Sequence, residues 1–155
     1  MARSDYQVVI DRVNPRPIAA VRARLRVDRV PAQFALYLDQ VYDASRKEGV
    51  SLDGQNIFVY RDAVDDTAEI DFGVGAVMPF SPVGAVTYSE TPGGRVATTA
   101  HWGEYSNLGQ AHAAVTGWCR SHGHQLAGPR WEAYGHWTDD PARRRTDIYY
   151  LLSDE

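Results

Sequence analysis

Hydrophobic and polar residues alternate in the stretch from Ile18 to Val27. Apolar side chains and arginines occupy alternate positions: Val21, Ala23, Leu25 and Val27 against Arg22, Arg24 and Arg26. Because successive side chains of a β-strand point to opposite faces, this pattern predicts a half-exposed strand. Tyr6 to Ile10 is a shorter strand candidate before it.

The period then changes to that of a helix. Apolar and small residues recur at three- and four-residue steps after Pro31: Phe34, Tyr37, Leu38, Val41 and Ser45. This spacing predicts an amphipathic helix with Pro31 in its first turn and its end near Gly49. Two strands are predicted after it, Asn56 to Arg61 and Ala68 to Val77, with a turn at Asp65-Asp66 between them.

The second half of the chain repeats this order of elements. A strand, a helix and two further strands are predicted at Val96 to Trp102, from the cap Ser106 or Asn107 to Gly123, at Arg130 to His136, and at Thr146 to Leu152. A turn at Asp139-Asp140 separates the last two strands.

One constant offset relates the two halves. Matching residues lie 74 positions apart: Gly49 and Gly123, Phe34 and Leu108, Gly54 and Gly128, Tyr60 and Tyr134, and the two Asp-Asp turns. We therefore predict an α+β fold of duplicated β-α-β-β units with pseudo-two-fold symmetry, an antiparallel sheet, two helices and a central ligand groove. Residues 1–155 form one domain of two repeats, about 6–78 and 83–152, joined by the Pro- and Gly-rich segment Pro79 to Gly94.

The repeat singles out Glu132. In the predicted strand around it, Glu132 and Tyr134 share one face. A carboxylate among rings on a half-buried surface costs free energy unless a cation or a hydrogen-bond donor meets it. The matching position in the first half is Phe58. Because one half tolerates an aromatic residue there, the fold itself does not require the acid, and Glu132 is the leading functional candidate.

Composition limits the class of protein. The 155 residues are 44% hydrophobic, which suits one globular domain with its own core. No run approaches the roughly 18 apolar residues of a membrane span. The single cysteine excludes an internal disulfide and favours a cytoplasmic location. The net charge of −4 argues against direct nucleic-acid binding. No sequence motif predicts a cofactor.

Several motifs of the second half resemble the GyrI-like (gyrase-inhibitor-like) family. They are His101-x-Gly103-x-Tyr105-x-x-Leu108, Trp118, Gly123, Gly128-Pro129, Trp131-Glu132-x-Tyr134, Asp140-Pro141 and Thr146-x-Ile148. Domains of this family also form the effector-binding part of some AraC-type and multidrug-responsive transcription regulators. The chain departs from the family pattern at Leu151, where proline is frequent, and shows no helix-turn-helix segment beside the domain.

The resemblance implies a pair of β-α-β-β units around a central groove that binds amphipathic, often cationic aromatic, small molecules. It assigns the charge partner of the ligand to Glu132, and the chain is then a stand-alone multidrug-type binding protein. The alternative is a hydrolase that opens cyclopropane-bearing DNA-alkylating natural products. In an enzyme, Glu132 is the catalytic residue that orients or deprotonates water while a tyrosine hydroxyl donates to the leaving oxygen.

Ring side chains are the candidates for the walls of such a site. Strand parity and the repeat offset select Tyr134, Phe58, Tyr60, Trp102, Tyr105 and Tyr149. Cation–π contacts with such rings contribute about 0.5–2 kcal/mol each. Packing in the core is the other interpretation of each ring.

Histidines raise the question of a metal. His122-Gly123-His124, with His112 and His136, are the candidates. The glycine that ends the helix, and the lack of a second cysteine or acid cluster, favour solvated loop histidines, so no metal is predicted. No feature of the sequence marks a surface for a protein partner such as gyrase.

Overall fold

The computed structural model describes residues 6–153. Its helices and strands, with short 3-10 turns before α1, before α2 and before β8, are β1 (Val9–Val13), β2 (Pro17–Arg26), α1 (Val30–Glu48), β3 (Leu52–Tyr60), β4 (Thr67–Ala76), β5 (Val86–Glu90), β6 (Gly94–Trp102), α2 (Leu108–Ser121), β7 (Leu126–Tyr134) and β8 (Arg145–Leu152).

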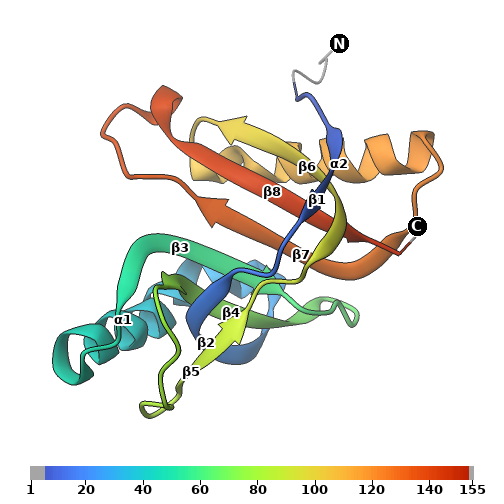
Figure 1. Cartoon of the computed structure of the whole chain (residues 1–155). Coiled ribbons are helices and arrows are strands. Elements are labelled where there is room, and N and C mark those ends of the chain that lie inside the picture. Colours follow the sequence, from blue (N-terminus) through green and yellow to red (C-terminus); the bar gives the residue numbers. More distant parts are fainter. Residues whose placement is uncertain (1–5, 154–155) are drawn as a thin grey trace.

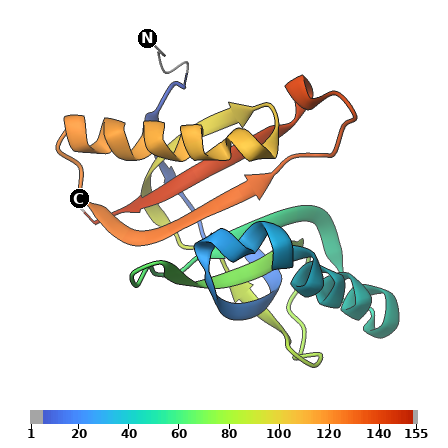
Figure 2. The ribbon, with the colours of Figure 1, turned by 180° about the vertical axis from the view of Figure 1, so that it is seen from behind.

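All eight strands form one antiparallel sheet in the order β1-β6-β8-β7-β3-β4-β2-β5 (Figure 1). Both helices lie on the same face of this sheet (Figure 2). The α+β class is therefore confirmed. Among the helices of residues 6–153, none has the length and apolar character that a membrane span needs.

Two β-α-β-β units build the sheet: β2-α1-β3-β4 and β6-α2-β7-β8. They meet where β3 pairs with β7, with Phe58 directly opposite Glu132. These two residues are 74 positions apart, so the pseudo-two-fold axis passes between them. The register of β3 shifts between Leu52 and Asn56, and that of β7 shifts at the same relative place. This shared irregularity supports a true duplication.

Two predictions about the elements need correction, and the prediction of α1 is confirmed. β1 lies at Val9–Val13, three residues later than predicted. α1 begins at Val30, close to the predicted start, and Gly49 follows it with the left-handed φ of 73° that glycine tolerates best. The segment expected to be a plain connection contains β5, which pairs with β2 at the sheet edge. The Pro- and Gly-rich residues around β5 are typical of a loop, so the sequence pattern did not predict this strand. Its pairing with β2 depends on the tertiary fold.

The core is divided by the sheet. On the helix-covered face, one cluster packs under α1 and another under α2, and Tyr134 contacts both. On the other face, Ile57, Val59, Trp131 and Ala133 form a third cluster. Neighbouring residues of β3 and β7 therefore face opposite layers, as strand alternation requires.

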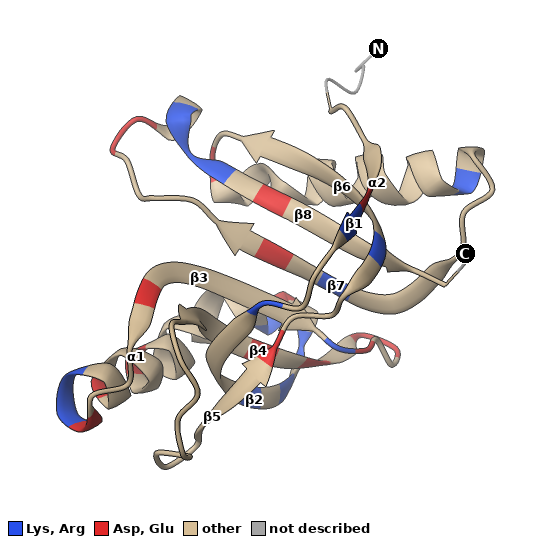
Figure 3. Ribbon diagram, in the orientation of Figure 1, with Lys and Arg blue, Asp and Glu red and all other residues tan. Residues whose placement is uncertain are grey.

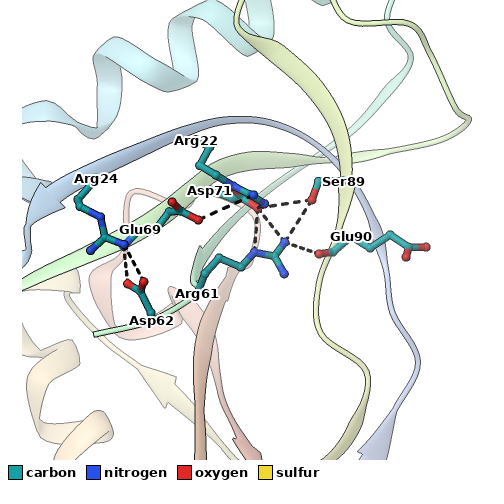
Figure 4. Close-up of polar contacts among 8 residues, drawn as sticks. All are labelled: Arg22, Arg24, Arg61, Asp62, Glu69, Asp71, Ser89 and Glu90. Atoms are coloured by element: carbon teal, nitrogen blue, oxygen red, sulfur yellow. Dashed lines mark hydrogen bonds and ion pairs between the residues drawn. The ribbon is translucent and has the colours of Figure 1, made fainter. Parts of the chain in front are cut away.

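A buried carboxylate also fastens the first repeat. Asp71 of β4 is 1% exposed and accepts four hydrogen bonds of 2.7–3.0 Å from Arg22 and Arg61 (Figure 4). Arg61 also contacts the hydroxyl of Ser89 and the backbone carbonyl of Glu90. Strands β2, β4 and β5 and the residue after β3 are thereby joined.

Asp71 should contribute stability that depends on pH. Burial raises its pKa, but hydrogen bonds from Arg22 and Arg61 outweigh burial and hold the pKa below its usual value. The contribution is then complete above pH of about 4, the unfolded value, and is lost as the pH falls through the lower folded-state pKa. We expect Asp71→Asn to lower the free energy of unfolding by about 2–4 kcal/mol at pH 7, since Arg22 is half exposed.

Urea denaturation at pH 7 and pH 3 measures this effect. The difference between wild type and Asp71→Asn should shrink at pH 3. Asp43→Asn is the control, because its ion pair with Arg46 lies on the exposed surface of α1 and should matter little. Equal stability of Asp71→Asn and wild type at pH 7 would contradict the prediction.

Candidate functional site

Glu132 lies at the centre of the molecule. β7 places it between Phe58 of β3 and Ile148 of β8 (Figure 1). Its side chain faces the helix-covered layer, and the residue is only 6% exposed. The acid is therefore enclosed where the two repeats meet.

Both carboxylate oxygens of Glu132 accept hydrogen bonds. The hydroxyl of Tyr134 donates to Oε1 at 2.7 Å, and Nε2 of His112 lies 2.7 Å from Oε2. Nδ1 of His112 in turn lies 2.7 Å from the hydroxyl of Tyr150. The result is a continuous polar chain of four side chains. Such charge-assisted bonds are what allow a carboxylate to be buried.

Two tyrosine hydroxyls supply hydrogen-bond donors of this chain. Burial raises the pKa of Tyr150 to about 12, against the lowering effect of Arg130. Burial, and next the charge of Glu132, raises the pKa of Tyr134 well above its usual value. Both hydroxyls therefore keep their protons at neutral pH. Tyr150 donates to Nδ1 of His112, which leaves the proton of the neutral imidazole on Nε2, pointing at Glu132.

Within residues 6–153, no lysine or arginine forms an ion pair with this acid. Among the ion pairs formed within residues 6–153, His112 is the partner of Glu132. The nearby guanidinium of Arg130 lies 4.5 Å from the ring centroid of Tyr60. Burial, and next the charge of Glu132, also raises the pKa of Tyr60. The charge of Glu132 therefore helps to raise the pKa of the tyrosines around it.

Aromatic rings lead from Glu132 towards the surface. The ring centroid of Tyr134 lies 5.1 Å from that of Phe58 and 5.4 Å from that of Tyr105. Phe34 of α1 contacts Phe58 at 5.7 Å, and Trp137 contacts Tyr105 at 6.3 Å. Phe34 is 37% and Trp137 is 64% exposed. The rings therefore enclose Glu132, while the two outermost rings, Phe34 and Trp137, are exposed to solvent.

The structure brings four of the predicted rings together with Glu132. Phe58 and Tyr60 are buried on its face of the sheet, Tyr134 bonds it, and Tyr105 packs on Tyr134. These positions agree with strand parity and with the repeat offset.

The other two predicted rings lie elsewhere. Tyr149 pairs with Trp131 and stacks on it at 5.1 Å, on the opposite face of the sheet, beside a hollow of about 90 Å³. Trp102 is 57% exposed at the end of β6, where Arg145 covers its ring. Alternation within a strand does not reveal which of two adjacent residues lies on the helix-covered face of the sheet. Glu132 pairs with Ile148, so Tyr150 shares its face and Tyr149 lies on the opposite one.

His112 and Tyr150 are the site residues that the sequence did not reveal. The expectation of a solvated loop histidine is wrong for His112, which lies in α2 and is half buried. A signal was present, because His112 stands one turn after Leu108 and three residues before Val115, both on the apolar face of the helix. Its contact with Glu132 depends on how α2 docks on the sheet.

Two of the remaining histidines lie at the end of α2, away from Glu132. His122 and His124 stack on Trp118, with ring centroids 4.2 and 5.4 Å away. Within residues 6–153, no three histidine, cysteine or acidic side chains gather where they could hold a metal ion.

A sequence profile of the GyrI-like small molecule binding domain matches residues 6–152. The chain belongs to this family. Comparison with curated protein sequences found no match.

Solved structures share this GyrI-like fold. The C-terminal domain of EcmrR matches with a TM-score of 0.76 and 16% identity, covering 98% of this chain and 100% of that one. In an EcmrR–DNA complex the TM-score is 0.79 and the identity 17%; 97% of this chain is covered, but it spans only 58% of that chain.

Two further proteins extend the comparison. SAV2435, solved bound to tetraphenylphosphonium, has a TM-score of 0.69 and 9% identity, with 97% and 94% of the two chains covered. A hydrolase from Listeria innocua has a TM-score of 0.58 and 11% identity, with 95% and 92% covered. At these identities the likeness concerns the fold.

The hydrogen-bond chain predicts the tautomer of His112. Nitrogen-15 NMR at a pH where the ring is neutral should find the proton on Nε2 and none on Nδ1. His122 is an internal control with the reverse tautomer, because its Nδ1 lies 2.9 Å from the backbone carbonyl of Trp118, which can only accept. A proton on Nδ1 of neutral His112 would rule out the assigned chain.

Proposed function

We propose that this GyrI-like domain binds amphipathic cations with aromatic groups, and that Glu132 is their charge partner. One observation carries the proposal: a buried carboxylate is held by the Tyr134 hydroxyl and the His112 imidazole, has no lysine or arginine partner within residues 6–153, and is surrounded by rings. In a weakly polar interior, a carboxylate without a full positive partner attracts a cation more strongly than it would in water.

The rings supply the rest of the recognition. Phe58, Tyr105 and Tyr134 add cation–π attraction and flat surfaces for stacking. Stacking follows no strict pattern of donors and acceptors, so ligands of different shapes are accepted. Because rings enclose Glu132 in this structure, a ligand must enter from an exposed outer end and displace side chains, with Phe34 and Trp137 as the entry points.

SAV2435, which shares the fold, was solved with tetraphenylphosphonium, a cation of this chemical class. We infer that drug sequestration or effector sensing is the role of such binding here. No cofactor is required, and the ligand itself is the proposed partner.

Calorimetric titration with tetraphenylphosphonium tests the role of Glu132. Loss of the charge in Glu132→Gln should weaken binding at least tenfold, about 1.4 kcal/mol. Glu104→Gln removes the same charge from an exposed position near Tyr105 and should leave the affinity unchanged. Triphenylphosphine oxide, which is neutral, should bind wild type and Glu132→Gln alike. Equal affinity of the cation for both folded proteins would refute the electrostatic role.

A hydrolase is the second candidate, favoured by the link of Glu132 to an imidazole and two tyrosine hydroxyls. In that case Glu132 would accept a proton from the water that attacks a cyclopropane carbon. The ring C–C bond would break, its electron pair would move to a conjugated carbonyl oxygen of the compound, and a tyrosine hydroxyl would protonate that oxygen. Incubation with a cyclopropane-bearing alkylating compound should then yield a product heavier by one water in mass spectrometry, with Glu132→Gln inactive. An intact compound after prolonged incubation with excess protein would remove this candidate for that class.

A further inference from the structure

An arginine rests on the outer end of the ring series. The guanidinium carbon of Arg144 lies 3.8 Å from the ring centroid of Trp137 and 5.8 Å from that of Tyr105. Both distances fall within the range of a cation–π contact. Arg144 is half buried, although it belongs to the loop between β7 and β8 where basic residues gather (Figure 3).

Backbone contacts hold this arginine in place. Its Nε–H donates to the carbonyl of Thr138 at 2.9 Å. Its own carbonyl accepts from the backbone N–H of Gly103 at 2.9 Å, two residues before Tyr105. The loop that carries the cation is therefore fastened to the segment that carries one of the rings.

Arg144 differs from other arginines on the sheet in its partners. Arg22, Arg24 and Arg145 each pair with a carboxylate. In the described part of the chain, Arg144 forms no ion pair within 4 Å and contacts rings and a carbonyl instead. Its positive charge occupies the same kind of surface that an aromatic-seeking ligand would need.

The position connects directly to the acid. Trp137 contacts Tyr105, Tyr105 contacts Tyr134, and the hydroxyl of Tyr134 donates to Glu132. A ligand cation that enters past Trp137 therefore meets a surface already covered by a guanidinium of the protein.

We propose that Arg144 is an internal competitor, which occupies the outer rings Tyr105 and Trp137 and so determines which cations bind. This inference rests on the proposed function. A planar guanidinium stacks on rings better than a compact, strongly hydrated ammonium ion does. Small alkylammonium ions gain too little to displace Arg144, whereas large cations that carry their own aromatic groups replace its contact with a wider one. Arg144 thus selects for lipophilic aromatic cations.

Affinity for tetraphenylphosphonium and for tetramethylammonium tests this selection. Arg144→Gln frees the outer rings and should raise the affinity for tetraphenylphosphonium about threefold to tenfold. Tetramethylammonium should gain at least as much. Arg143→Gln is the matched control, since it removes an equal charge from the exposed neighbouring position and should change affinity less than twofold. Arg144→Lys keeps the charge but loses the planar stack, and should fall between wild type and Arg144→Gln.

The outcomes separate this inference from the proposed function. If Glu132→Gln weakens binding as expected while Arg144→Gln matches Arg143→Gln, the competition is refuted and the role of Glu132 stands. If wild type and Arg144→Gln bind neither cation, both are refuted. Proton NMR of the Arg144 side chain provides a second measurement: ring-current shifts from Trp137 should disappear when tetraphenylphosphonium binds, and shifts that persist at saturation would overturn the competition.

Discussion

Burial of the Glu132 carboxylate is the constraint around which the middle of the molecule is organised. Removing an anion from water costs several kcal/mol, and the protein offsets this cost with two hydrogen bonds at 2.7 Å. All the donors come from the second repeat: Tyr134 from β7 itself, His112 from α2, and Tyr150 behind it from β8. The first repeat contributes Phe58 and other rings. The two repeats therefore share one fold, but the hydrogen-bond donors around Glu132 come from only one of them.

Two buried acids in this chain are stabilised in different ways. Asp71 is clamped by two guanidinium groups, so its charge is neutralised within the protein and its effect is structural. Glu132 is held by hydroxyl and imidazole groups, and within residues 6–153 no lysine or arginine pairs with it. Two protein cations hold the first acid in place, whereas the second is the proposed charge partner of a ligand cation. This physical difference separates Asp71, a structural carboxylate, from Glu132, the candidate for ligand binding.

The layers of the fold explain why the site lies on one side only. Both helices cover the face that carries Glu132, and their packing encloses the rings around it. The opposite face is filled by Trp131 and Tyr149 stacked on each other. Tyr134 contacts the cores of both repeats, so movement of this ring would be felt by both helices.

The sequence by itself determined the duplicated unit, the helix and strand periods, and the asymmetry between Phe58 and Glu132, because each is written in local spacing or in a constant offset. Only the tertiary structure decided that Tyr150 and not Tyr149 faces the acid, that α2 presents His112 to it, and that β5 completes the sheet edge. These choices depend on register between strands and on helix docking, which are fixed by contacts between residues distant in sequence. The local spacing of apolar and polar residues determines neither strand register nor helix docking.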